Sequence, residues 1–155
     1  MAGVCEARLA KLGLVLPAAP APAASYVPFT RSGSLLFVSG QLPMQDGKLA
    51  FVGKIGAELT LEQGQAAAKL CAVNILAQIK AAAGDLDRVA QVLRLVGYVA
   101  SAPDFTDQHK IVNGASELIA AIFDEAGRHA RTSVGVPALP LNAAVEVEAT
   151  VELKA

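Results

Sequence analysis

Apolar and polar positions recur along the chain with two different periods, and each period predicts one type of element. The clearest helix begins at Thr60, where Thr60 and Gln63 fit a capping box, and apolar residues follow at helical spacing until Gly84. Residues 145–153 alternate strictly between apolar and mostly acidic side chains. That alternation is typical of a strand with one buried face and one polar face.

The remaining segments complete an α+β order. Apolar runs predict four further strands, at 26–30, 35–38, 91–101 and 132–136. Helical spacing predicts a short helix over 4–12 and a second long helix, with Pro103 in its first turn and Gly127 at its end. The economical arrangement of these elements is a mixed or antiparallel sheet with two helices packed on one face.

Such a sheet has a second face that no helix covers. The run 35–38 is continuously apolar and therefore typical of a strand buried on both faces. An apolar, uncovered sheet face indicates self-association.

The length sets the domain organisation. A chain of 155 residues and 15.9 kDa has the size of one domain. Pro17, Pro20 and Pro22 enforce an extended stretch after the short helix. We therefore expect a helix and proline-rich arm over 1–25 and a single domain over 26–155.

The composition narrows the possible partners. Hydrophobic residues make up 54% of the chain, charged residues 17%, and the formal net charge is −1. This excludes intrinsic disorder and gives no basic surplus for nucleic acid. Charged and polar residues such as Lys69 and Gln78 interrupt the apolar runs, so we expect no membrane partner. The apolar run 12–16 is too short for a signal peptide, which favours a cytoplasmic protein.

Few residues carry candidate chemistry. His109 and His129 have no cysteine or histidine at ligand spacing, so we expect no metal. His129 has the pattern of a surface residue rather than a catalytic base. Cys71 lies on the apolar helix face and is expected in the core, while Cys5, in an arm expected to be mobile, is given no role.

Two features remain. Arg131 stands at the mouth of an apolar strand, and its guanidinium fork suits a carboxylate. Glu146 and Glu148 follow on one face of the last strand. By pattern alone, a surface arginine and a solvated acidic face are the favoured interpretations of these two features.

These residues lie within motifs that resemble those of the YjgF/RidA family, whose older label is endoribonuclease L-PSP. Four ordered matches carry the resemblance: LFVSGQLP at 36–43, GDL at 84–86, ARTSV at 130–134 with LP at 139–140, and VEVEA at 145–149. They cover 26–152 and leave the arm outside. The length and the entry at Tyr26 are most similar to the longer YjgF-like branch.

The resemblance implies a chorismate-mutase-like fold with two helices on one face of a mixed sheet. It also implies a homotrimer in which the sheets form a central barrel with clefts between neighbouring subunits. Members of the deaminase type hydrolyse reactive 2-imino and enamino acids to 2-oxo acids and ammonia, without a cofactor. The alternative is a cleft that binds a small carboxylate or carbonyl metabolite without turnover.

The resemblance also assigns roles to residues of this chain. Arg131 would bind the substrate carboxylate, and Glu146 would lie near the attacking water. The remaining cleft contributions would come from Tyr26, Ser39, Gly40, Asn113 and Ser133. Ser133 stands where the family often has cysteine, and Ser116 stands where an aromatic residue is common. Both differences alter the cleft wall and leave the choice of substrate open.

Overall fold

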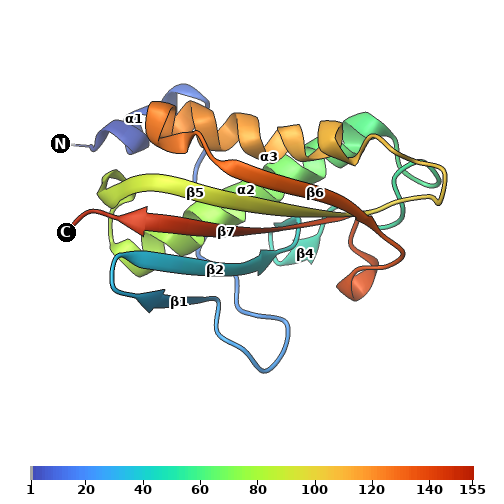
Figure 1. The fold of residues 1–155 in the computed structure, drawn as a ribbon, viewed down its shortest axis with the longest axis horizontal. Coiled ribbons are helices and arrows are strands. Elements are labelled where there is room, and N and C mark those ends of the chain that lie inside the picture. Colours follow the sequence, from blue (N-terminus) through green and yellow to red (C-terminus); the bar gives the residue numbers. More distant parts are fainter. Residues whose placement is uncertain (1) are drawn as a thin grey trace.

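The computed structural model describes residues 2–155 as three α-helices and a five-stranded mixed sheet (Figure 1). The helices are α1 Val4–Lys11, α2 Leu61–Ala83 and α3 Gln108–Phe123. The strands, in order across the sheet, are β1 Phe29–Ser32, β2 Leu35–Gln41, β7 Val145–Leu153, β5 Val89–Ala100 and β6 Ala130–Val136. Only the β5–β6 pair is parallel, and the short strands β3 Met44–Gln45 and β4 Lys48–Leu49 pair separately. The predicted α+β class with a mixed sheet is confirmed.

Helices α2 and α3 pack on one face of the sheet, and α2 crosses behind β5 and β7 in Figure 1. The predicted capping box is present, because Thr60 Oγ1 accepts from the Gln63 amide and Gln63 Oε1 accepts from the Thr60 amide. The two helices approach closely at Gly114, where a β-carbon would lie 2.1 Å from the Gln65 carbonyl oxygen. Within residues 2–155, α2 alone is long and apolar enough to span a bilayer, but 67% of its most apolar window is buried inside the domain.

Several predicted boundaries differ from the observed ones, and three of the differences have a structural reason. The first strand begins at Phe29 rather than 26, because residues 26–28 form bends ahead of the sheet. Helix α3 begins at Gln108, well after Pro103, because the segment before it is held by backbone bonds between Ile55 and Ala100 and between Ala102 and Ile55. At its other end α3 stops at Phe123, and Gly127 closes a separate 3₁₀ turn.

Within residues 2–155 the opposite face of the sheet carries no helix. Leu36 and Val38 of β2 are buried beneath the helices, but Phe37 between them is 44% exposed on the open face. Within one chain β2 is therefore not buried on both faces, contrary to the prediction from its apolar run. Val134 of β6 adds a second exposed apolar side chain to this face. Self-association through the face stays a prediction.

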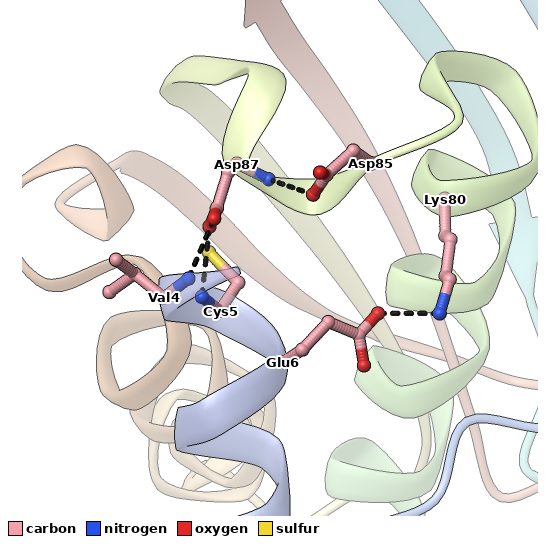
Figure 2. Close-up of polar contacts among 6 residues, drawn as sticks. All are labelled: Val4, Cys5, Glu6, Lys80, Asp85 and Asp87. Carbon is pink, nitrogen blue, oxygen red and sulfur yellow. Dashed lines mark hydrogen bonds and ion pairs between the residues drawn. The ribbon is translucent and has the colours of Figure 1, made fainter. Parts of the chain in front are cut away.

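The N-terminal helix is docked on the domain (Figure 2). The amides of Val4 and Cys5 donate to Asp87 Oδ2 and Oδ1 at 2.6 and 2.8 Å, and Glu6 pairs with Lys80. Cys5 is buried in the main core, so its expected place in a mobile arm was wrong. Burial, with the neighbouring Asp87 carboxylate, raises the pKa of the Cys5 thiol to about 12. The thiol is therefore protonated near neutral pH and is a poor nucleophile.

We expect Asp87→Ala to lower the free energy of unfolding by about 1 kcal/mol, because it removes the cap from the first turn of α1. Hydrogen bonds from Cys5 and Val4 lower the pKa of Asp87, so its stabilising effect is present above the ordinary aspartate pKa and is lost as the pH falls through the lowered value. Urea unfolding at several pH values measures both effects. Asp104→Ala, an equal charge change at an exposed residue, is the control, and equal losses in both variants would contradict the capping role.

Candidate functional site

The Arg131 guanidinium lies between the edge strand β6 and helix α3. In the sheet Arg131 pairs with the buried Leu95, so its side chain points toward the helices. Its Nη1 donates to Asn113 Oδ1 at 2.9 Å and to Ser116 Oγ at 3.1 Å, and its Nη2 donates to the His109 carbonyl oxygen at 2.9 Å. The structure thus brings together Arg131 and Asn113, two of the predicted site residues.

The Arg131 side chain has unused binding capacity. A guanidinium has five N–H donors, and the three bonds above leave the Nε–H and one Nη2–H. Within residues 2–155 no aspartate or glutamate pairs with it. Partial burial lowers the pKa of Arg131, and an arginine side chain stays charged in proteins. The result is a fixed positive charge with two free donors, which is the arrangement that a carboxylate takes.

Sequence reasoning missed two polar neighbours of this arginine. Ser116 and His129 form a hydrogen bond of 2.8 Å, and the His129 ring also bonds to the Gly127 carbonyl oxygen at 2.6 Å. His129 is half-buried, so its interpretation as a surface residue was wrong. The available signal was its spacing, since a residue two positions before Arg131 points to the same face of an extended segment.

Ser133 shares that face two residues after Arg131. Its hydroxyl oxygen is buried and has no hydrogen-bond partner within residues 2–155. A buried hydroxyl without a hydrogen-bond partner is uncommon. This one lies on the same face of β6 as Arg131, and the resemblance implies that Ser133 contributes to the cleft.

Glu146 lies elsewhere on the sheet. It pairs with Tyr98 on the open face and packs against Gly40, where a β-carbon would lie 2.2 Å from Glu146 Oε1. Burial, with a smaller contribution from the Glu148 carboxylate, raises the pKa of Glu146. The neighbouring Glu148 accepts a hydrogen bond from the Tyr98 hydroxyl at 3.3 Å. Glu146 has no side-chain hydrogen-bond partner among residues 2–155.

Of the other predicted residues, Gly40 contacts Glu146, and Ser39 and Tyr26 lie along β2 and the segment that enters it. Ser39 Oγ donates to the Val27 carbonyl oxygen at 2.7 Å and its amide donates to Pro28, which ties β2 to the entry segment. Tyr26 and Gly40 both line a pocket of about 400 Å³ beneath the proline-rich segment 17–23. Gly40 therefore connects Glu146 with this pocket, and these residues lie apart from Arg131 and Asn113.

The two groups do not meet within one chain. Arg131 of β6 pairs with Leu95 of β5, which in turn pairs with Ala149 of β7, so these three side chains share one face. Glu146 lies three residues before Ala149 on β7. Residues an odd number apart on a strand point to opposite faces. Arg131 thus faces the helices and Glu146 faces the open side. Across residues 2–155 no group of three histidine, cysteine, aspartate or glutamate residues is arranged to hold a metal ion.

Comparison with known proteins gives one consistent result. The family model described as "YjgF/chorismate_mutase-like, putative endoribonuclease" matches residues 6–153, so the similarity includes most of α1 and extends beyond the 26–152 expected from the motifs. Protein TCP17 of Trypanosoma cruzi is 53% identical over 152 residues, which cover 97% of this chain and 95% of that protein.

Two crystal structures are similar along nearly the whole chain. Protein Atu1372 from Agrobacterium tumefaciens has a TM-score of 0.92 at 55% identity, covering 97% of this chain and 93% of that one. A protein from Shewanella oneidensis described as a putative endoribonuclease has a TM-score of 0.95 at 40% identity, covering 97% and 100%.

Proposed function

The chain belongs to the YjgF/RidA family, and from the arrangement of its site we propose that it hydrolyses reactive 2-imino and enamino acids to 2-oxo acids and ammonia in clefts between copies of a homotrimer. The observation that carries the proposal is the Arg131 guanidinium, half-buried, held by α3 and left with two free N–H donors. A small acid bearing a carboxylate matches those donors.

The reaction needs two groups from the protein. Arg131 binds the carboxylate and thereby fixes the adjacent imine carbon. Glu146 takes a proton from water as the oxygen adds to the carbon of the protonated imine, which gives a 2-amino-2-hydroxy acid. Glu146 then returns the proton to the nitrogen, the C–N bond breaks and ammonia leaves. The hydroxyl proton passes back to the Glu146 carboxylate and from there to ammonia, which gives the 2-oxo acid and ammonium. The raised pKa of Glu146 suits a group that must both accept and return a proton.

The placement of the two groups supports the proposed assembly. Because Arg131 and Glu146 point to opposite faces, a complete site needs the Glu146 face of a second copy beside Arg131. The open face with Phe37 and Val134 is the surface that assembly would cover. We expect a particle of about three times 15.9 kDa by light scattering after size exclusion.

Mixed oligomers test whether the cleft is shared. In co-assembled Arg131→Ala and Glu146→Gln chains, random mixing gives wild-type pairs of arginine and glutamate in about a quarter of the clefts. We therefore expect recovery of about a quarter of the wild-type rate from two inactive variants, measured after co-expression. If one copy supplied both groups, mixing would restore nothing.

The activity is measured as ammonia release from freshly generated 2-iminopropanoate or 2-iminobutanoate. We expect the wild-type protein to exceed the rate of spontaneous hydrolysis, and a protein that never does so overturns the deaminase proposal. RNA hydrolysis, which the family description names, fits the chain less well, because a net charge of −1 gives no basic surplus for phosphate.

The second candidate function is binding without turnover. It is favoured by Ser116 and Ser133, which stand in the cleft region where related proteins commonly carry larger or more reactive side chains. Thermal stabilisation by 2-oxobutanoate in a protein that releases no ammonia would support it.

A further inference from the structure

A series of hydrogen bonds connects Arg131 to Ser116, His129 and Gly127. It begins at Nη1, the guanidinium nitrogen that carries neither of the two free donors. Arg131 Nη1 lies 3.1 Å from Ser116 Oγ, Ser116 Oγ lies 2.8 Å from His129 Nε2, and His129 Nδ1 lies 2.6 Å from the Gly127 carbonyl oxygen. These four groups join α3, the 3₁₀ turn after it and the start of β6.

The chemistry of the end groups gives every bond its direction. The Gly127 carbonyl can only accept, so His129 Nδ1 carries the hydrogen. The neutral ring then has a lone pair on Nε2 that accepts from the Ser116 hydroxyl. The Ser116 oxygen, whose own hydrogen points to His129, accepts from Arg131, which can only donate.

The surroundings favour this neutral ring. Burial lowers the pKa of His129, the bond to Gly127 opposes that effect, and the nearby Arg131 charge adds to it. A protonated ring would place a second positive charge beside the arginine, joined to it through one hydroxyl oxygen.

We propose that Ser116 and His129 are positioning residues that lock the Arg131 guanidinium so that its free Nε and Nη2 donors face the bound carboxylate. Asn113 and Ser116 together occupy both hydrogens of Nη1, and the His109 carbonyl takes one of Nη2. Loss of the Ser116 bond leaves one half-buried donor unsatisfied and the guanidinium held by two of its three bonds. This role rests on the proposed function, because it presupposes an acid bound at Arg131.

The kinetic constants of Ser116 variants distinguish a positioning role from a role in folding. Ser116→Ala is expected to raise KM for 2-iminobutanoate about tenfold, or about 1.4 kcal/mol, with kcat unchanged, because the carboxylate is bound equally in the ground and transition states. Ser116→Thr, which keeps the hydroxyl, restores KM. Glu117→Ala, at the next and exposed position of α3, is the control and leaves both constants unchanged. An unchanged KM in Ser116→Ala would overturn the role.

A double-mutant cycle tests the link between the two residues. Because His129 acts through Ser116, Ser116→Ala combined with His129→Ala is expected to raise KM no further than Ser116→Ala alone. His129→Gln offers an oxygen in place of Nε2 and is expected to recover part of the loss seen in His129→Ala. Fully additive effects on KM would overturn the link.

Nitrogen NMR of the free protein tests the hydrogen-bond chain without a ligand. At neutral pH we expect His129 to be neutral with its hydrogen on Nδ1, a form that water does not favour. A ring with the hydrogen on Nε2 and intact turnover would overturn the positioning role alone. The other outcome is a ring with its hydrogen on Nδ1 in a wild-type protein that neither releases ammonia nor binds 2-oxobutanoate. That result would overturn the proposed function and with it the positioning of a substrate.

Discussion

Arg131→Ala is expected to lower kcat/KM for 2-iminobutanoate by about 10³, because it removes two hydrogen bonds from a charged donor to the substrate carboxylate. The variant removes the hydrogen-bond donor that Asn113 and Ser116 share, but it creates no cavity in the apolar core. The loss should therefore appear in catalysis more than in stability. Ammonia release and the affinity for 2-oxobutanoate measure it, with thermal unfolding to confirm the folded state.

Two further variants make the result specific. Arg128→Ala removes a nearby arginine whose contact is an exposed pair with Glu125, so we expect no change in activity. Arg131→Lys keeps the charge but not the planar fork, so its activity should lie between those of Arg131→Ala and the wild type. Equal rates for Arg128→Ala and Arg131→Ala would remove the basis for a carboxylate site at β6.

Glu146→Gln is expected to lower kcat by about 10² to 10⁴, the range that general base catalysis contributes, with little change in KM. Only the ionised carboxylate can take a proton from water. Because burial and Glu148 raise the pKa of Glu146, the wild-type rate should rise with pH through a midpoint above the ordinary glutamate value. The glutamine variant should show no such rise.

The same raised pKa has a consequence for stability. A carboxyl group that is harder to ionise in the folded chain than in the unfolded chain destabilises the fold once the pH exceeds its unfolded pKa. Glu146→Gln should therefore unfold at a higher temperature than the wild type at pH 7. A variant that is both inactive and less stable would indicate a structural role.

Glu148→Gln is the matched control for this strand. Glu148 faces the same side as Glu146 and accepts from Tyr98. Removing its charge eases ionisation of Glu146, so the midpoint of the pH profile should move downward while the maximal rate is kept. A profile that does not move would show that another group controls the rate.

The sequence predicts those elements whose local pattern agrees with their final environment. Residues 145–153 alternate without interruption, and β7 occupies that range. Helix α2 carries its own start at Thr60 and its own end at Gly84, which has a φ of +81°. In both cases the local signal needs no help from distant residues.

Other features depend on residues far apart in the sequence. The start of α3 is set by bonds of the preceding segment to Ile55, so Pro103 alone could not indicate it. The faces of Arg131 and Glu146 are related only through β5, which pairs with β6 on one side and with β7 on the other. That pairing joins residues far apart in the sequence, so motif spacing could not tell that the two side chains face opposite sides.

If the clefts form between copies as proposed, the separation of Arg131 and Glu146 onto opposite faces would make activity depend on protein concentration. A lone chain would then carry one half of two different clefts and a complete copy of neither. Specific activity should then fall on dilution below the dissociation constant of the assembly, and an inactive but assembly-competent chain should inhibit its wild-type neighbours by occupying their faces.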